Sequence, residues 1–326
     1  MTTEEEIIDI FRGKFPLFNG IGDDSAVIPY QNNRHYITTQ DSLVENIHFR
    51  TSYYAPIDLA HKAIAVNISD ISAMGGSPLY LWNSISFPKH RISYMNEWSR
   101  EFCEFCLREN ISIMGGDITE SPNDIYISIT LIGVIDEKYI KRMAGAQCGD
   151  LILLCGNPGH AHIGLLSYEN GISDSSLGIY REALKNPKIR TDEGKWIAQQ
   201  KSVHSMTDTS DGILVNLRRM LKKSQKSACI EQSWFQPPLS FIEACKMVEC
   251  NPETTQLIGG EDYSLMFCTE NRAVEEICTE FKKRFGYTLK IIGIIAEENN
   301  HDITIKNHGV EQQISSPEFN HFMATR

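Results

Sequence analysis

Apolar and polar positions follow two different periods along this chain, one typical of strands and one typical of helices. Residues 125–135 alternate in steps of two and are rich in β-branched side chains, which predicts a strand with one buried face. Residues 58–76 instead form a helix-length run rich in Ala, Ile, Val and Met. Asp58 is the expected N-cap of this helix, and Gly75-Gly76 followed by Pro78 is the expected stop.

The same patterns predict both kinds of element along the whole chain, so we expect an α/β (α+β) protein. Expected strands cover residues 35–40, 79–87, 111–119, 125–135, 151–155, 203–207, 264–268, 290–296 and 302–305, and the strand at 111–119 is expected to be buried. Expected helices cover residues 4–12, 93–108, 213–223 and 273–285, one contains 163–166, and others flank 186–187, whereas 169–177 is expected to be a loop.

Length and composition predict two soluble domains, because 326 residues exceed one ordinary hydrophobic core. We place the boundary near residue 140, which gives an N-terminal domain of residues 1–140 and a C-terminal domain of residues 141–326. No apolar run approaches the roughly 20 residues that span a bilayer, and the acidic start lacks the features of a signal peptide. The net charge of −11 argues against nucleic acid and anionic membranes as partners.

The nine cysteines are odd in number and scattered, which predicts reduced thiols and a cytoplasmic protein. Only Cys103 and Cys106 have the spacing of a metal or redox pair, and they lie in a helical pattern without a second pair nearby. We therefore expect them to pack in the core.

Carboxylates recur beside glycines or at the ends of expected strands. They are Asp23, Asp24, Asp41, Asp117, Asp208 and Asp211, and Asp70 adds another on the face of the central helix that also carries Asn67. Several of them have an ordinary structural alternative. Asp23-Asp24 could be an exposed turn, the Gly-Gly-Asp at residues 115–117 a bulge, and Ser210 and Asp211 helix caps. Asp70 could pair with an arginine and Asn67 could cap a loop.

Taken together, these carboxylates predict a cage for several Mg²⁺ ions and a polyphosphate. No companion set of Cys and His accompanies them, and hard oxygen ligands suit magnesium better than zinc. The chain lacks a Walker-type phosphate loop, a Gly-x-Ser-x-Gly elbow and a kinase His-Arg-Asp loop. Phosphoryl transfer through metal ions needs mainly positioning and charge neutralisation, so no side chain is expected to act as a nucleophile.

Seven motifs in order and in register resemble the thiamine-monophosphate kinase family. They are Gly20-Ile-Gly-Asp-Asp-Ser-Ala26, Asp41-Ser-Leu-Val44 with His48-Phe49, Ala65-Val-Asn-Ile-Ser-Asp-Ile-Ser-Ala-Met-Gly-Gly-Ser-Pro78, Gly115-Gly-Asp117, Arg142 with Gly145-Ala146 and Gly149-Asp150, Asp208-Thr-Ser-Asp-Gly212, and Gly259-Gly-Glu-Asp-Tyr263. The resemblance extends from about residue 4 to Phe319-Asn-His-Phe322.

The resemblance implies ATP-dependent phosphorylation of thiamine monophosphate to thiamine diphosphate, with ATP as co-substrate and several Mg²⁺ ions. It implies the two-domain fold of the aminoimidazole ribonucleotide synthetase (PurM-like) superfamily, in which the N-terminal sheets of a homodimer close a barrel and a C-terminal α/β domain packs alongside. By matching positions, it assigns metal binding to Asp24, Thr39, Gln40, Asp41, Asp70, Asp117, Asp208 and Asp211. It assigns ATP contacts to Gly116, Asp117, Arg142 and Ser210, and the thiamine site to His48, Glu261 and Phe319.

The chain departs from the family at three places. Gln40 and Thr209 replace a usual threonine and a usual aliphatic residue, and residues 184–188 replace an Arg-Pro-x-Pro-Arg segment. His48 also has the ordinary alternative of a structural histidine.

Related enzymes of the same fold are the nearest rival assignments. Selenophosphate synthetase would need a reactive Cys near the N-terminus, and no Cys precedes Cys103. The hydrogenase-maturation relative would need a C-terminal cysteine tail, whereas this chain ends in Phe-Met-Ala-Thr-Arg. Aminoimidazole ribonucleotide synthetase stays open as an alternative but lacks support from His48 and the Gly-Gly-Glu-Asp-Tyr segment. Intact Asp70, Asp117 and Asp211 count against a non-catalytic nucleotide-binding or metal-binding protein on this scaffold.

Overall fold

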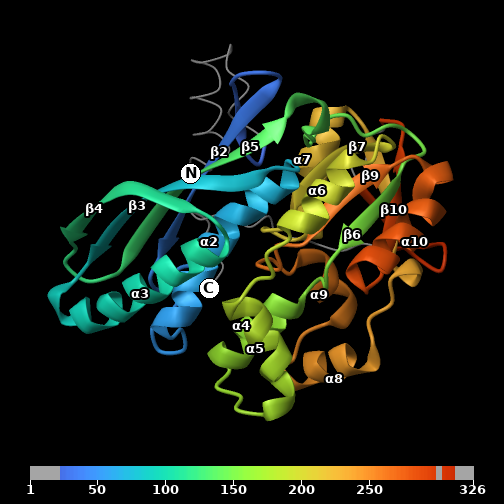
Figure 1. Cartoon of the computed structure of the whole chain (residues 1–326). Coiled ribbons are helices and arrows are strands. Elements are labelled where there is room, and N and C mark those ends of the chain that lie inside the picture. The colour runs from blue at the N-terminus through green and yellow to red at the C-terminus, as the bar shows by residue number, and fades with distance from the viewer. Residues whose placement is uncertain (1–22, 299–302, 313–326) are drawn as a thin grey trace.

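Two β-sheets and the helices packed on them make up the part of the chain that this computed structural model describes, residues 23–298 and 303–312 (Figure 1). The first sheet has the strand order β1-β2-β5-β3-β4, with β1 at Ala26–Pro29, β2 at Arg34–Val44, β3 at Ser77–Phe87, β4 at Ser112–Glu120 and β5 at Tyr126–Asp136. Its neighbouring strands are antiparallel except for β3 and β4, which run parallel.

The second sheet has the order β12-β11-β8-β10-β6-β9-β7 and is antiparallel except between β8 and β11. Its strands are β6 at Leu151–Cys155, β7 at Val203–Asp208, β8 at Ser227–Glu231, β9 at Leu265–Thr269, β10 at Lys290–Ala296, β11 at Ile303–Asn307 and β12 at Val310–Gln312. In Figure 1 the first sheet and the second sheet lie on opposite sides of the molecule.

The helices fill the space between and around the sheets. They are α2 at Pro56–Ala73, α3 at Ile92–Arg108, α4 at His160–Glu169, α5 at Gly178–Lys185, α6 at Thr191–Gln199, α7 at Ile213–Ser224, α8 at Leu239–Met247, α9 at Pro252–Ile258 and α10 at Val274–Phe285. Short 3₁₀ helices lie at Lys89–Arg91, Glu137–Tyr139, Ser175–Leu177, Gln232–Trp234 and Asn271–Ala273.

Helix α2 connects the two halves of the molecule. It packs on α3, β2 and β5 of the first half and on α6 and β7 of the second half. Thirteen of its residues are buried, so its surroundings are protein nearly all the way round. Any polar side chain on this helix must therefore find its partner inside the protein.

Both ends of α2 follow from local sequence, with one correction. The helix begins at Pro56, so Asp58 is not the N-cap but lies in the first turn, where its carboxylate accepts a hydrogen bond from the main-chain nitrogen of Ala55 at 3.1 Å. The predicted stop is confirmed. Gly75 has a φ of +86°, and the main-chain nitrogens of Gly75 and Gly76 donate to the carbonyls of the last turn.

Most predicted elements are confirmed, and β6 and β10 have the predicted bounds. Strand β5 alternates between buried and more exposed positions along its length, as its period of two predicts. The prediction of a buried strand at residues 111–119 is wrong, because β4 is the edge strand of its sheet and is exposed along its whole length. Its Gly-Gly-Asp lies in the middle of the strand and not at its end. The helix predicted at residues 4–12 lies outside the described residues.

The close crossing of α2 and α6 yields a stability prediction. A Cβ atom on Gly194 of α6 would lie 2.4 Å from the main-chain oxygen of Ser72 on α2. We expect Gly194→Ala to lower the free energy of unfolding by about 1–3 kcal/mol, because the helices must move apart. This loss would exceed the gain of about 1 kcal/mol that alanine brings to a helix interior. Urea denaturation followed by circular dichroism measures the change.

Gly178→Ala is the matched control, because a Cβ atom there meets nothing within 4 Å. We expect this variant to be as stable as the wild type. Equal stability of both variants would contradict the proposed tight crossing.

Candidate active site

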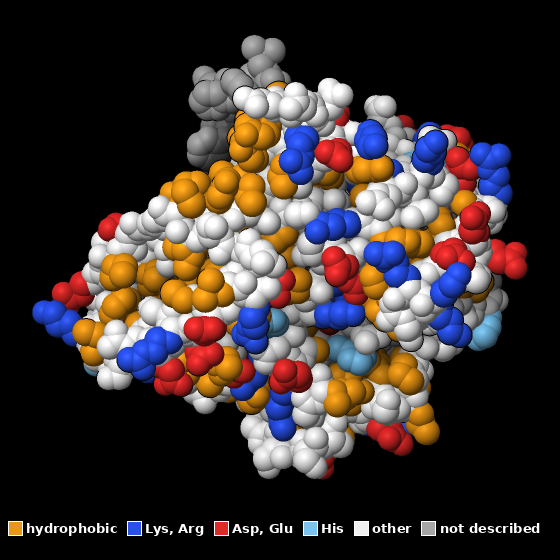
Figure 2. Space-filling view, viewed as in Figure 1, with side chains coloured by type: hydrophobic (Ala, Val, Ile, Leu, Met, Phe, Trp, Pro, Cys, Tyr) orange, Lys and Arg blue, Asp and Glu red, His pale blue; other side chains and the backbone are white. Residues whose placement is uncertain are grey.

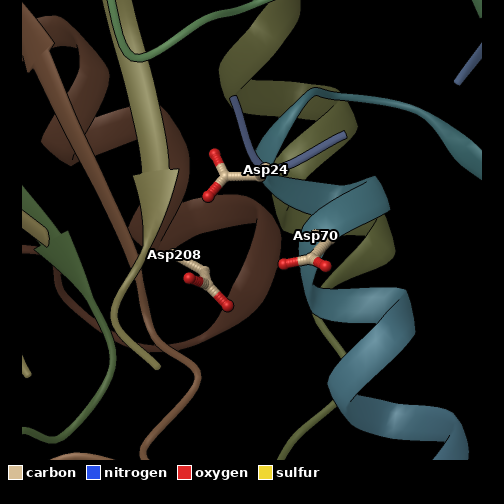
Figure 3. A group of neighbouring side chains, drawn as sticks. All are labelled: Asp24, Asp70 and Asp208. Atoms are coloured by element: carbon tan, nitrogen blue, oxygen red, sulfur yellow. The ribbon is translucent and has the colours of Figure 1, made fainter. Parts of the chain in front are cut away.

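Three aspartates from distant parts of the sequence meet between the two halves of the molecule. Asp24 precedes β1, Asp70 lies on α2 and Asp208 ends β7 (Figure 3). Each offers a carboxylate oxygen, and the three oxygens all lie within 4.8 Å of one another. Figure 3 shows the three side chains pointing toward a common centre. The predicted convergence of these three carboxylates is thus seen in the fold.

Each of the three carboxylates accepts a hydrogen bond from one or more hydroxyl groups that fix its orientation. The donors are Thr39 to Asp70 at 2.5 Å, Thr207 to Asp24 at 3.0 Å, Ser69 to Asp208 at 2.7 Å and Ser210 to Asp208 at 3.1 Å. A hydroxyl donor orients a carboxylate but does not neutralise it. The negative charge of the cluster is therefore not neutralised by these hydrogen bonds.

The electrostatics of the cluster favour the binding of a cation. Burial raises the pKa values of Asp24 and Asp70 well above their usual range, and the neighbouring aspartates raise them further. Burial also raises the pKa of Asp208. The Oδ2 atom of Asp24 is buried and has no hydrogen-bond partner. A divalent cation held by hard oxygen ligands would satisfy this atom and remove the repulsion, so the residues fit Mg²⁺.

Asp41 and Asp211 extend the acidic cluster. The pKa of Asp41 is raised to about 7 by burial and by the charges of Asp208, Asp211 and Glu261. The main-chain nitrogen of Asp41 donates to the side-chain oxygen of Asn67 at 3.2 Å. Asn67 on α2 thus holds strand β2 and does not cap a loop. Asp70 forms no ion pair with an arginine in the described part of the chain.

Basic side chains pair with the outer carboxylates of this region. Asp23 accepts from Arg142 Nη1 at 3.0 Å, from Lys223 Nζ at 3.2 Å and from the main-chain nitrogen of Met143 at 3.3 Å. Arg219 Nη1 lies 2.6 Å from Asp211. Acidic groups for a metal and basic groups for an anion therefore lie side by side, as a metal–polyphosphate ligand requires.

A second charged group lies near Asp41, formed by Glu261 and Lys62. Lys62 of α2 is fully buried and forms an ion pair with Glu261. Its ammonium nitrogen also contacts the Tyr54 hydroxyl at 3.0 Å and the carbonyl oxygen of His48 at 3.2 Å. The Nδ1 atom of His48 accepts from the main-chain nitrogen of Val44 at 3.0 Å. Two residues expected at the thiamine site are thus joined through one lysine.

Some predicted site residues do not reach the cluster. Gly116 and Asp117 lie on the exposed strand β4, and no hydrogen bond or ion pair links Asp117 to the cluster within the described ranges. The side chain of Gln40 contacts Ser128 and Thr130. Successive side chains of a strand point to opposite faces, so Gln40 cannot share the face of Thr39 and Asp41. Phe319 lies outside the described residues.

Several residues with roles in this region were not predicted, among them Lys62, Ser69, Thr207 and Lys223. Ser69 and Thr207 each directly precede a predicted aspartate, and this adjacency was the available signal. Lys62 could have been found as a charged residue inside an apolar helix. Nothing in the local sequence marks Lys223, because its partner Asp23 is far away in the chain.

Family models and known relatives match both halves of the chain. Residues 22–135 match the family model described as AIR synthase related protein, N-terminal domain, and residues 147–306 match that of the C-terminal domain. The thiamine-monophosphate kinase of Buchnera aphidicola subsp. Schizaphis graminum is 30% identical over 319 residues, covering 93% of this chain and 92% of the relative. That of Aquifex aeolicus is 33% identical over 256 residues, covering 76% and 79%.

Solved structures are similar over nearly the whole chain. The structure of AaThiL complexed with AMPPCP and TMP has a TM-score of 0.84 at 25% identity and covers 98% of this chain and 97% of that one. The hydrogenase maturation protein HypE of E. coli has a TM-score of 0.73 at 16% identity, covering 87% and 86%, which shows the shared fold alone. Within the described residues, no helix has the length and apolar character needed to cross a membrane.

The raised pKa values yield a prediction for Mg²⁺ binding. In the metal-free protein the aspartates hold protons at pH values where the unfolded chain, with a pKa of about 3.9, has lost them. These groups therefore destabilise the fold increasingly as the pH rises from about 4 through their folded pKa values. We expect MgCl₂ to raise the midpoint of thermal unfolding more at about pH 8 than at about pH 5.5, measured by scanning fluorimetry.

Asp70→Asn should reduce this Mg²⁺-dependent shift, whereas Asp192→Asn, at an exposed position of α6, should retain it. An Mg²⁺ shift of equal size at both pH values would contradict metal binding by the buried carboxylates.

Proposed function

Because the chain belongs to the thiamine-monophosphate kinase family, we propose that it phosphorylates thiamine monophosphate at the expense of ATP, the last step of thiamine diphosphate biosynthesis. The observation that carries the proposal is the meeting of Asp24, Asp70 and Asp208 beside the basic pair Arg142 and Lys223. An acidic cluster alone could hold a cation, but its basic neighbours favour a metal-bound polyphosphate.

In the proposed reaction an oxygen of the thiamine phosphate attacks the γ-phosphorus of ATP. The bond from that phosphorus to the β–γ bridging oxygen breaks, and ADP leaves with the electron pair. Such transfers depend on in-line positioning and on neutralising the phosphate oxygens, so no covalent intermediate on the protein is required. The AMPPCP in the similar structure is an ATP analogue and supports this choice of donor.

The acidic cluster is proposed to hold several Mg²⁺ ions. Asp24, Asp70 and Asp208 would form the centre of this site, with Asp41 and Asp211 at its edge. When bound, magnesium supplies positive charge to the phosphate oxygens. The hydroxyl groups of Thr39 and Ser69 would keep two of the carboxylates aimed at it. Arg142 and Ser210 are proposed to contact ATP.

The thiamine site is proposed to lie at Glu261 and His48, with Phe319 completing it. Thiamine carries a cationic thiazolium ring, and a carboxylate such as that of Glu261 suits a cation. The side chain of Glu261 is 30% exposed, so part of it remains accessible although Lys62 holds it. An aromatic ring such as that of Phe319 can stack on a cationic ring.

We propose that a second copy of the chain covers the first sheet and that the paired sheets close a barrel. Large apolar side chains are exposed on β3, β4 and β5, namely Trp82, Ile113, Met114, Ile118 and Tyr126. Figure 2 shows hydrophobic side chains gathered on the side of the molecule that carries β3 and β4. Exposed apolar patches of this kind mark interfaces. Gly116 and Asp117 lie on β4, one of the strands in this proposed interface, so their proposed roles depend on the dimer.

The two domains are proposed to have different roles. We propose that residues 1–140 bind ATP and magnesium and form the dimer, and that residues 141–326 complete the active site with Asp208, Asp211 and Glu261. We also propose a cytoplasmic location. None of the nine cysteines forms a disulfide, and all nine lie within the described residues.

The proposal is tested by incubating the purified protein with ATP, MgCl₂ and thiamine monophosphate and separating the products by chromatography. We expect thiamine diphosphate and ADP in equal amounts. Omission of Mg²⁺ should abolish the reaction, and unphosphorylated thiamine should not replace the acceptor. ADP formation without thiamine diphosphate would contradict the proposed acceptor.

Asp70→Asn should lower kcat by roughly 100-fold or more, because it removes a negative charge from the centre of the proposed metal site. The fold should persist, since an amide of nearly equal size replaces a carboxylate that is repelled by its neighbours. Circular dichroism checks the fold and the product assay checks kcat. Asp192→Asn is the control and should keep full activity, whereas an active Asp70→Asn enzyme would remove Asp70 from the metal site.

A further inference from the structure

Lys62 is a charged residue that the proposed reaction does not use, and its burial is unusual. It is fully buried in α2, a helix otherwise lined mostly by small and apolar residues. Removing an ammonium group from water costs several kcal/mol unless its charge and its donors are matched inside the protein. A lysine at this position therefore needs specific partners.

The ammonium group of Lys62 has three N–H donors, and three acceptors from other residues surround it. They are the carboxylate of Glu261, the hydroxyl oxygen of Tyr54 at 3.0 Å and the carbonyl oxygen of His48 at 3.2 Å. Burial alone would lower the pKa of Lys62, but the charge of Glu261, the Tyr54 side chain and the hydrogen bonds to both together outweigh it and raise that pKa above its usual value. The lysine is thus held as a cation with every donor used.

The three acceptors come from two segments that are far apart in the sequence. His48 and Tyr54 belong to the loop between β2 and α2, and Glu261 belongs to the loop between α9 and β9. Tyr54 is itself fixed, because its hydroxyl donates to the carbonyl oxygen of Leu184 at 3.0 Å. Lys62 therefore joins the two loops that carry His48 and Glu261.

The backbone at Glu261 is also constrained. Its φ is +70°, in the left-handed region that a residue other than glycine seldom adopts, and its main-chain nitrogen donates to the carbonyl oxygen of Ser210 at 2.7 Å. With its main chain set by Ser210 and its carboxylate set by Lys62, Glu261 has one defined position. The Glu261 side chain is nevertheless 30% exposed, so it is not fully covered by these contacts.

We propose that Lys62 is a positioning residue for the acceptor site: its ammonium group holds the Glu261 carboxylate and the His48 loop in the arrangement that binds thiamine monophosphate. This inference rests on the proposed function. Lys62 is separate from the Asp24–Asp70–Asp208 cluster, so it should affect the binding of thiamine monophosphate and not that of Mg-ATP. The loss of a hydrogen bond to a charged group corresponds to about a tenfold change in binding.

The first test is Lys62→Met, which keeps the length of the side chain and removes its charge and donors. We expect KM for thiamine monophosphate to rise about tenfold and KM for ATP to change by less than about twofold. Equal rises in both KM values, or no rise in either, would overturn the proposal. A purely structural role would lower stability without separating the two KM values.

Lys185→Met is the matched control. Lys185 forms an ion pair with Asp58 of α2 at 2.7 Å, so it also joins α2 to the second half of the molecule, but none of its contacts is with Glu261 or His48. We expect this variant to lose stability and to keep the KM for thiamine monophosphate of the wild type. A rise like that of Lys62→Met would overturn the specific role of Lys62.

A double-mutant cycle tests whether Lys62 acts through Glu261 and also guards against misfolding. Lys62→Met with Glu261→Gln removes both charges, so no carboxylate is left without its cation. We expect the double variant to raise KM for thiamine monophosphate no more than Glu261→Gln alone. If the two substitutions together raise this KM by the product of their separate factors, the proposed action through Glu261 is overturned. If Lys62→Met does not fold, Tyr54→Phe removes one of its acceptors, and we expect a rise of about threefold in the same KM alone.

Wild-type turnover separates this inference from the proposed function. If the wild type does not phosphorylate thiamine monophosphate, the proposed function fails, and this inference fails with it. If the wild type is active and the Lys62 variants keep its KM values, only the role of Lys62 is overturned.

Discussion

The repulsion among crowded, largely enclosed carboxylates is the constraint on which the rest of this structure depends. Asp24, Asp70 and Asp208 offer oxygens within 4.8 Å of one another in a region where burial raises their pKa values. No protein benefits from such a cluster as a core, since apolar residues would pack there at lower cost. Positive charge placed among these carboxylates would remove their repulsion, and this is why we propose that the cluster binds metal ions.

Helix α2 positions these charged groups, because several of its polar side chains bind specific partners. Lys62 binds Glu261, Asn67 accepts from the main chain of Asp41, and Asp70 accepts from Thr39. These contacts reach loops and strands of both halves of the molecule from positions a few residues apart on one helix. The distance between the acidic cluster and the Glu261 group is therefore set by the rigid rise of a helix and not by flexible loops.

The sequence predicted the members of the site better than their geometry. Asp70 could be identified because a carboxylate in an apolar helix needs a partner, and Asp208 because it ends a short buried strand. Gln40 could be assigned only by analogy, and the alternation of β2 turns its side chain away. The burial of β4 was wrongly predicted, since an apolar run does not reveal that its strand lies at a sheet edge. Lys62 could be noticed as a charged residue in an apolar helix, but its partner Glu261 is 199 residues away and could not be inferred from the local pattern.

Charge balance explains why both signs occur so close together in a chain with a net charge of −11. The Asp23 carboxylate is bound by Arg142, by Lys223 and by a main-chain nitrogen, which are the kinds of donors that bind a phosphate oxygen. The Asp23 carboxylate thus uses these donors, while the carboxylates of the neighbouring acidic cluster accept from hydroxyl groups. A metal–polyphosphate complex would bring positive charge to the acidic cluster and phosphate oxygens to the basic donors, whereas a free metal ion or a free phosphate would bring only one of the two. This complementarity of acidic and basic groups is why we propose that metal and nucleotide bind this site together.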